Sequence, residues 1–456
     1  MRRIGQVREE VRRKIQGSLL NAVREVLPDA RIRELCAEEL SGMRERILVP
    51  TAMIWYWVAA GLSRERSFAS VWAELWIPVA SIHPEVAGWR PHDTGVLTRA
   101  RQRIPEEALR KLKAEVSGQA LEEQNEWGYW REKRVILWDG STLSLEDTRE
   151  LTAAFGKPSN QHGPAAFPAL RLVNLVQKDT WITVGNAWGR YDAAETDLAW
   201  SAAEALRPGD VLLADRLFSG IGAMARLQKC GVDFVMRKFS TFDVTMHPRT
   251  RIGPNDWLVK VKVPSKDRKE HPGLPETIAI RVLKRTVGLG RNRKVLWLLT
   301  SLLYPEKAPA EELVALYGSR WGIEESFDEL KTELHLDVLR SRTVEGVGKE
   351  IEAHLLAYNL VRLMILRAAR QEGVPLKQIS FVSAVRTILC VSDCMREAPA
   401  GLLTQMYHVM LKEIAGALNP HRPGRTEPRA VRRGPKPFPR LRTSRARWRD
   451  TGKLAS

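Results

Sequence analysis

The chain has 456 residues, with 72 Lys and Arg against 54 Asp and Glu, and a formal net charge of +18. This length supports several domains and a sizeable core, and the basic excess favours nucleic acid over a membrane as partner, because neutralised phosphates release counterions. Basic charge also occurs in proteins without catalytic activity, so it does not by itself indicate an enzyme. The four cysteines argue against a disulfide framework and fit a reducing cytosol.

The N-terminal part, residues 1–128, is predicted to be a helical DNA-binding module. Its start, "MRRIGQVREEVRRKIQG", lacks the apolar region of a signal peptide. The most apolar run, residues 47–62, contains Pro50 and is too short to span a bilayer, so we expect a buried helix and no membrane association. The basic residues Arg99, Arg101 and Arg103 allow two interpretations, a grip on DNA backbone or a solvated basic face. We expect a cytoplasmic protein associated with the nucleoid.

Residues 129–237 have the pattern of an α/β domain. Strands are predicted for "RVILWDG", ended by Asp139-Gly140, and for "ALRLVNLVQ" and "TWITVGNAW", joined by a turn at Lys178-Asp179. A helix, a buried strand ending at Asp215, a second helix and the strand "VDFVMRKF" follow. The order β-β-β-α-β-α-β predicts a mixed sheet flanked by helices.

The remaining chain divides by composition into four parts. Residues 238–305 are predicted to be a β-rich insertion, and residues 306–370 to complete the α/β domain. Residues 371–419 are predicted to be helical, with Cys390 and Cys394 buried as small apolar side chains rather than binding a metal ion. The tail at 420–456 is rich in Arg and Pro, so we expect it to be disordered when free and to contact DNA rather than only to improve solubility.

Two carboxylates stand out because each follows an apolar strand. Asp139 and Asp215 are placed where open sheets commonly build their sites, although an aspartate after a strand is more often a turn former or a helix cap. Together with an acid from a later helix they would form an oxygen-rich pocket for Mg²⁺. Two such ions can activate an attacking oxygen and stabilise a leaving one.

The third acid lies in "YGSRWGIEESFDELK", residues 317–331. On a helix the intervals of three, four and seven residues bring Tyr317, Arg320, Glu324 and Lys331 onto one stripe. This stripe adjoins an apolar one, whereas Glu329 and its acidic neighbours are expected to face solvent. Taken alone, the helix allows a plain alternative, in which its leucines dock it and Arg320 and Glu324 form a surface pair that contributes little.

These features resemble the IS4 family of bacterial insertion-sequence transposases, which are DDE transposases with a ribonuclease-H-like core. The resemblance rests on the strand and helix order, on the spacing Tyr317-x2-Arg320-x3-Glu324-x6-Lys331, and on the segments "DGSTLSL", "ADRLFSG" and "RWGIEE". The N-terminal helical segments are similar to the family's N-terminal module. The resemblance covers residues 35–370 and weakens in the insertion and the tail.

The resemblance implies an enzyme that cleaves DNA at the ends of an insertion sequence and transfers the strands into target DNA by a cut-and-paste route. It implies that Asp139, Asp215 and Glu324 are catalytic and bind Mg²⁺, with two ions expected and Mn²⁺ able to substitute. It assigns Tyr317, Arg320 and Lys331 to the DNA end, and Arg216 either to a phosphate or to an ordinary ion pair. It also implies terminal inverted repeats as the DNA partner and a homodimer in the synaptic complex.

Trp297, in "VLWLLTS", is one residue out of register with the tryptophan that family members with a DNA-hairpin step use to hold a flipped base. We therefore expect it to pack in a core. Two other functions stay open, a nuclease on the same fold that hydrolyses without strand transfer and a DNA-binding protein without catalysis.

Overall fold

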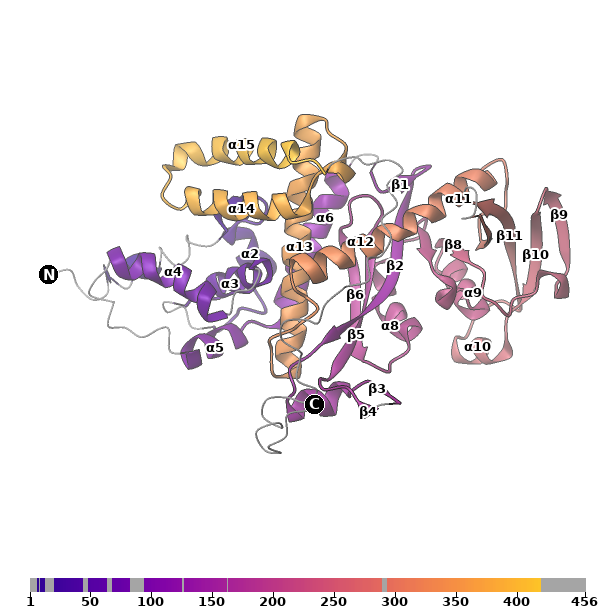
Figure 1. Cartoon of the computed structure of the whole chain (residues 1–456), viewed down its shortest axis with the longest axis horizontal. Helices are drawn as coiled ribbons and strands as arrows, with labels where there is room; N and C mark the ends of the chain where they lie inside the picture. The colour runs from indigo at the N-terminus through magenta and orange to yellow at the C-terminus, as the bar shows by residue number, and fades with distance from the viewer. Residues whose placement is uncertain are drawn as a thin grey trace, which may run out of the picture.

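A computed structural model describes residues 6–7, 9–12, 20–43, 48–63, 68–82, 94–124, 127–161, 163–288 and 293–419. Figure 1 shows N-terminal and C-terminal helices on one side of a central sheet, and a β-rich part at its other end. The predicted basic tail at 420–456 lies outside the described residues. In the part of the chain that is described, no helix is long and apolar enough to cross a membrane.

The central sheet has the strand order β6-β5-β2-β7-β8. Its first three strands are antiparallel neighbours, and β2, β7 and β8 are parallel. This mixed arrangement, with helices on both faces, confirms the predicted ribonuclease-H-like fold class. The strands are β2 (Lys133–Ser144), β5 (Ala169–Gln177), β6 (Thr183–Arg190), β7 (Val211–Ala214) and β8 (Asp233–Arg237).

The prediction that β2 ends at Asp139-Gly140 is wrong. The strand continues to Ser144, because it keeps pairing with β5 through the register Asp139↔Asn174 to Ser144↔Ala169. Its parallel pairing with β7, however, stops at Trp138↔Ala214. Asp139 and Asp215 therefore each directly follow the last paired residue of β2 and β7, Trp138 and Ala214. Parallel strands lie about 4.8 Å apart, so the backbones of Asp139 and Asp215 are neighbours.

The predicted β-rich insertion is confirmed between β8 and the next helices, where it extends the central sheet. β12 (Lys294–Thr300) pairs with β8 through Leu298↔Arg237 to Thr300↔Val235. β11 (Thr277–Val287), β10 (Asp256–Lys262) and β9 (Arg249–Gly253) continue outward. Sequence analysis did not predict a short helix, α10 (Ser265–Glu270), within this part.

Trp297 lies on β12 and is half-buried against the core beside the insertion, as expected for a packing role. Its ring stacks on that of Trp257, with centroids 6.0 Å apart, and Lys284 Nζ lies 5.1 Å from its centroid. The alternation of β12 thus places Trp297 on the face of the sheet that also carries Leu299.

Two apolar cores lie on the two faces of the sheet. Leu137 of β2 belongs to the core shared with α13 (Val344–Glu372), α6 (Glu106–Glu123) and the N-terminal helices. Trp138 belongs to the core shared with α8 (Glu195–Ala202) and α9 (Ile221–Lys229). Because successive strand residues face opposite sides, Asp139 faces the α13 side and Gly140 the α8 side.

The N-terminal part is helical, as predicted, and packs against the sheet domain. It contains α2 (Asp29–Leu35), α3 (Pro50–Leu62), α4 (Phe68–Ile82), α5 (Thr94–Gln102) and α6. The apolar run is α3, which is buried along almost its whole length, as expected. In the last helix of this part, Lys113 pairs with Glu352 of α13 at 2.6 Å, and both side chains are buried.

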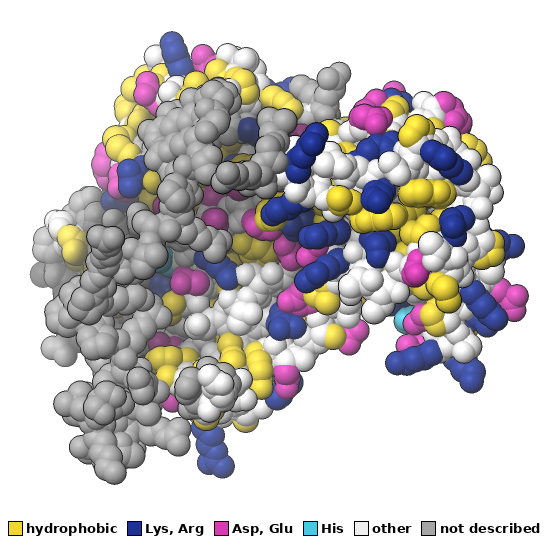
Figure 2. Space-filling view, turned by 45° about the vertical axis from the view of Figure 1, so that its right-hand side comes forward, with side chains coloured by type: hydrophobic (Ala, Val, Ile, Leu, Met, Phe, Trp, Pro, Cys, Tyr) yellow, Lys and Arg dark blue, Asp and Glu magenta, His cyan; other side chains and the backbone are white. Residues whose placement is uncertain are grey.

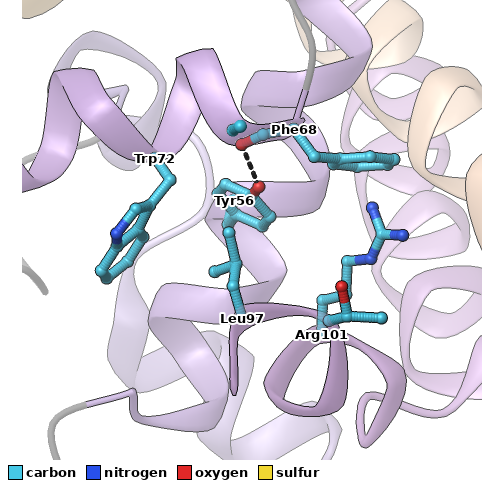
Figure 3. Close-up of a pocket in the computed structure, with 7 residues that line it drawn as sticks. Tyr56, Phe68, Trp72, Leu97 and Arg101 are labelled. Atoms are coloured by element: carbon cyan, nitrogen blue, oxygen red, sulfur yellow. Dashed lines mark hydrogen bonds between the residues drawn. The ribbon is translucent and has the colours of Figure 1, made fainter. Parts of the chain in front are cut away.

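A cavity of about 120 Å³ lies among α3, α4 and α5. Figure 3 shows Tyr56, Trp72, Leu97 and Arg101 around it, and the Tyr56 hydroxyl donating a hydrogen bond to the Phe68 carbonyl. The Arg101 guanidinium lies 3.6 Å from the centre of the Phe68 ring, so it serves packing in this part of the chain. Arg99 and Arg103 are exposed, and both interpretations of them stay open.

The C-terminal described part consists of α13, α14 (Phe381–Met395) and α15 (Leu403–Gly416), which lie together in Figure 1. The predicted helical region therefore resolves into separate helices that pack on one another. The prediction that Cys390 and Cys394 are buried is wrong, because both lie on the exposed face of α14.

Candidate active site

Residues 310–333 form a helical run that crosses β2 in Figure 1, but they are not one regular α-helix. α11 (Ala310–Gly318) leads into a 3₁₀ turn at Ser319–Trp321, α12 (Gly322–Asp328) and a π-helical turn at Glu329–Glu333. Such π turns occur often at functional sites. Gly322 allows the start of α12 to lie close to Trp181, because a Cβ at residue 322 would lie 2.9 Å from the indole nitrogen.

Arg320 joins two of the predicted carboxylates. Its Nη1 donates to Asp139 Oδ2 at 3.4 Å, and its Nη2 donates to Glu324 Oε1 at 3.1 Å. The Arg320 side chain is 7% exposed, Asp139 24% and Glu324 47%, so the guanidinium lies beneath the two acids. The plain alternative of a surface Arg320–Glu324 pair is thus wrong, because the arginine is buried and is shared with a residue of β2.

Asp215 lies directly after β7, and its Oδ1 accepts a hydrogen bond from the Arg216 backbone nitrogen at 2.7 Å. This contact caps the 3₁₀ turn Arg216–Phe218, which is the ordinary use of an aspartate after a strand. The charge of Asp215 nevertheless acts on Arg320. Burial would lower the pKa of Arg320, but Tyr317, Asp139, Glu324 and Asp215 together raise it. Arg216 is exposed, and its side chain has no ion pair within the described residues.

Burial raises the pKa of Asp139, and the negative charges of Glu195 and Glu324 act in the same direction. The hydrogen bond that Asp139 accepts from the Gly140 nitrogen at 2.8 Å and the charge of Arg320 oppose this shift. Sequence analysis did not single out Glu195 as a neighbour of Asp139. Glu195 begins α8, and an acid in the first turn of a helix gives no sign of which strand it will face.

The four residues of the predicted polar stripe differ in exposure. Tyr317 is buried in the core, and burial raises the pKa of its hydroxyl. Lys331 is half-buried, and its Nζ donates to the Thr142 carbonyl of β2 at 3.1 Å. Burial lowers the pKa of this ammonium group. The stripe therefore contacts β2 through Arg320 and Lys331.

The prediction that Glu329 faces solvent is wrong. Its Oε2 accepts hydrogen bonds from the Tyr358 hydroxyl at 2.8 Å and from Arg362, both on α13. The Arg362 guanidinium also lies 4.3 Å from the centre of the Trp181 ring. The helical run 310–333 is packed between β2 and α13, so the side that carries Glu329 contacts α13 instead of water.

The site fits a divalent cation by its chemistry. Carboxylate oxygens are the ligands that Mg²⁺ and Mn²⁺ prefer, and the acids already hold a cationic group, the Arg320 guanidinium, between them. Within the described residues, no three Asp, Glu, His or Cys side chains are close enough together to hold a metal ion. Arg320 lies between Asp139 and Glu324, and its charge offsets the repulsion between the two acids.

A basic surface lies on the same side of the molecule as the insertion. Figure 2 shows Lys and Arg side chains gathered there around a patch of hydrophobic side chains. Such a surface suits the phosphate backbone of nucleic acid. The exposed basic residues of this part include Arg237, Arg249, Arg251, Lys260, Lys262, Arg293 and Lys294.

Comparison with known proteins identifies the family of the chain. Residues 130–360 match the family described as "Transposase DDE domain", and residues 19–113 match "Insertion element 4 transposase N-terminal". The chain belongs to the DDE transposases, in their IS4 family, and is a DNA transposase. This confirms the resemblance and the class of enzyme predicted from the sequence.

A relative and a solved structure share most of their length with the chain. The "Transposase InsG for insertion sequence element IS4" of Escherichia coli (strain K12) is 26% identical over 404 residues, which cover 87% of this chain and 88% of the relative. The structure of a piggyBac transposase synaptic complex with hairpin DNA has a TM-score of 0.44 and 11% identity, and the match covers 90% of this chain and 87% of that one.

Proposed function

We propose that Asp139, Asp215 and Glu324 form the catalytic metal site of this transposase. DDE transposases depend on divalent metal ions, and we assign two Mg²⁺ ions to this site, with Mn²⁺ able to substitute. The observation that carries the proposal is the Arg320 guanidinium held between Asp139 and Glu324, at the point where the β2 and β7 pairing ends beside Asp215. When bound, the ions would activate the attacking oxygen and stabilise the leaving one.

The basic residues around this site are proposed to hold the DNA end. Lys331 and Arg216 are accessible enough to contact backbone phosphates directly. Arg320 and Tyr317 are buried, so their part in binding depends on release of Arg320 from the two acids. A cation that neutralises Asp139 and Glu324 would free the guanidinium for a phosphate, which it can bind with two parallel hydrogen bonds.

We infer that the substrate is double-stranded DNA with terminal inverted repeats, joined by cut-and-paste transfer to a target. The support is the match along 87% of the chain to a transposase of an insertion sequence element. Two DNA ends must be joined to one target, so a homodimer in the synaptic complex is part of the proposal. Hydrolysis without strand transfer is the alternative, and the products of the reaction distinguish the two.

The test uses Glu324→Gln, which keeps the size of the side chain but removes the charge that a metal ligand must supply. Cleavage of a labelled duplex that carries the element's end should fall by roughly three orders of magnitude. A gel shift on the same DNA should be unchanged or stronger, since an anion near phosphate is removed.

Glu325→Gln is the matched control, because it makes the same change in charge one residue along the same helix, on an exposed side chain. Its cleavage rate should stay within about threefold of the unchanged protein. Near-normal cleavage by Glu324→Gln would remove this residue from the site.

A further inference from the structure

Asn174 of β5 is an amide side chain in an otherwise apolar part of the sheet. It is 0% exposed, and neither its Nδ2 nor its Oδ1 has a hydrogen-bond partner within the described residues. Leu172 and Val176, two residues away on either side, belong to the core shared with α13. Asparagine is depleted from strands, and a buried amide without partners costs free energy that an apolar side chain would not. Packing therefore gives no reason for an asparagine at this position.

The register of the sheet places Asn174 beside Asp139. β5 lies between β2 and β6 (Figure 1), and Asn174 is directly opposite Asp139 on β2. Their side chains therefore share one face, with Cβ atoms about 4.5 to 5.5 Å apart. On its other side Asn174 is opposite Asn186 of β6, which already donates to Glu352 Oε1 at 2.8 Å and accepts from Lys113. Of the two neighbours, the carboxylate of Asp139 is the stronger acceptor.

Other donors hold both oxygens of Asp139 in this structure. Oδ1 accepts from the Gly140 backbone nitrogen at 2.8 Å, and Oδ2 accepts from Arg320 Nη1 at 3.4 Å. The second distance is long, because a charge-assisted hydrogen bond between nitrogen and a carboxylate is typically about 2.7 to 2.9 Å. The contact with Arg320 is therefore the one that Asp139 can exchange for another donor.

An ordinary structural role is the competing explanation. Buried water molecules often satisfy buried polar groups, and one could join Asn174 to Asn186 and hold β5 to β6. In that case Asn174 stabilises the sheet, and its replacement weakens the fold. A role toward Asp139 predicts the opposite sign, because the amide would then be left without a partner for as long as Arg320 holds the carboxylate.

We propose that Asn174 is a positioning residue for Asp139, to whose carboxylate it donates from Nδ2 when Arg320 leaves. The inference rests on the proposed function of Asp139 as a metal ligand. Carboxylates that bind a metal ion are usually held in orientation by a hydrogen bond from a neighbouring group. Arg320 is poorly suited to that part, because its charge repels a cation, whereas the amide of Asn174 is neutral.

The first test needs no metal and compares Asn174→Val in two backgrounds by thermal unfolding of the full chain. In the unchanged protein the substitution should raise the midpoint, because it removes a buried amide without partners. In Arg320→Ala the amide can bond to Asp139, so the same substitution should lower the midpoint. Any misfit of the valine is common to both backgrounds and cancels in the comparison. Equal effects in the two backgrounds, of either sign, would overturn the proposal.

The second test measures Mn²⁺ binding to the full chain without DNA, by isothermal titration calorimetry. Asn174→Val should weaken binding by about tenfold. The matched control is Thr183→Val on β6, since Thr183 is also 0% exposed and its Oγ1 has no hydrogen-bond partner in the described part of the chain. Its affinity should stay within about twofold, because β6 pairs with β5 and not with β2. A tenfold loss in both variants would indicate a general effect of the core and overturn the proposal.

Asp139→Asn, titrated in the same way, separates this inference from the proposed metal site. Loss of binding in Asp139→Asn with normal binding in Asn174→Val would overturn only the role of Asn174. Normal binding in Asp139→Asn would overturn the proposed metal site itself.

Discussion

Arg320 holds two residues that are distant in the sequence, Asp139 and Glu324, at a single guanidinium. At the scale of one residue it is therefore both a counter-ion for the acids and a candidate phosphate ligand. A phosphate would compete with the two acids for the Nη1 and Nη2 groups that they now occupy. A cation that enters between the acids would decide which of these two functions Arg320 performs.

Replacement of Arg320 should change metal binding and DNA binding in opposite directions. Arg320→Ala removes a positive charge about 3 Å from Glu324 Oε1, so Mn²⁺ affinity without DNA should rise by roughly threefold to tenfold. Binding of the DNA end should weaken, and cleavage should fall with it. Calorimetry and a gel shift on the same preparation measure both. Weaker metal binding would show that Arg320 supports the site instead of competing for it.

Lys331 gives a second test at this scale. If its ammonium group contacts one phosphate, Lys331→Ala should reduce the slope of log binding constant against log salt concentration by about 0.9. Lys377, which pairs with Asp179 at 2.6 Å, is a matched control with an expected change near zero. Binding of the DNA end is measured at several salt concentrations. Equal changes in the two variants would mean that Lys331 acts only through the net charge.

At the scale of elements, the register between β2 and β7 sets the site. Arg134 at the start of β2 forms two hydrogen bonds with Asp210, just before β7, at 2.8 and 2.5 Å. Both side chains are buried, at 7% and 4% exposed. This pair lies at the end of the strands opposite to Asp139 and Asp215. It fixes which residues of β2 and β7 lie side by side.

Asp210→Asn should therefore destabilise the fold by about 3 to 5 kcal/mol, because it leaves the Arg134 cation buried without a counter-ion. Glu312→Gln breaks an ion pair with Arg131 whose side chains are 43% and 42% exposed, and should cost less than about 1 kcal/mol. Urea denaturation of both variants gives the two free energies of unfolding. Similar losses in the two would refute the special role of the buried pair.

At the scale of the whole molecule, the positive charge is concentrated outside the carboxylate site. It lies on the insertion side in Figure 2 and in the tail at 420–456, which Arg and Pro dominate. Charges spread over a surface attract any DNA, whereas the site must select one phosphodiester bond. Affinity and chemical selection therefore belong to different parts of the chain.

Deletion of residues 420–456 should reduce DNA affinity most at low salt and flatten its salt dependence. Discrimination between the element's end and unrelated DNA should be kept, because phosphate contacts carry no sequence information. Competition gel shifts at two salt concentrations measure both effects. Loss of discrimination with an unchanged salt slope would make the tail a reader of sequence.

The sequence by itself determined the order of elements and the residue types of the site. Alternating apolar patterns predict strands, and apolar patterns at helical spacing predict helices. The spacing of Tyr317, Arg320, Glu324 and Lys331 is also local, and a helix places these four side chains on one face. Asp139 and Asp215 could be selected because each follows an apolar run. A helical spacing and the end of a strand are each encoded in a few neighbouring residues.

Only the tertiary structure decided which groups meet. The continuation of β2 beyond Gly140 depends on β5, the contacts of Glu329 depend on α13, and the approach of Glu195 to Gly140 depends on how α8 lies under the sheet. Each of these pairs is far apart in the chain. No local pattern encodes such a contact, because it results from packing whole elements against one another.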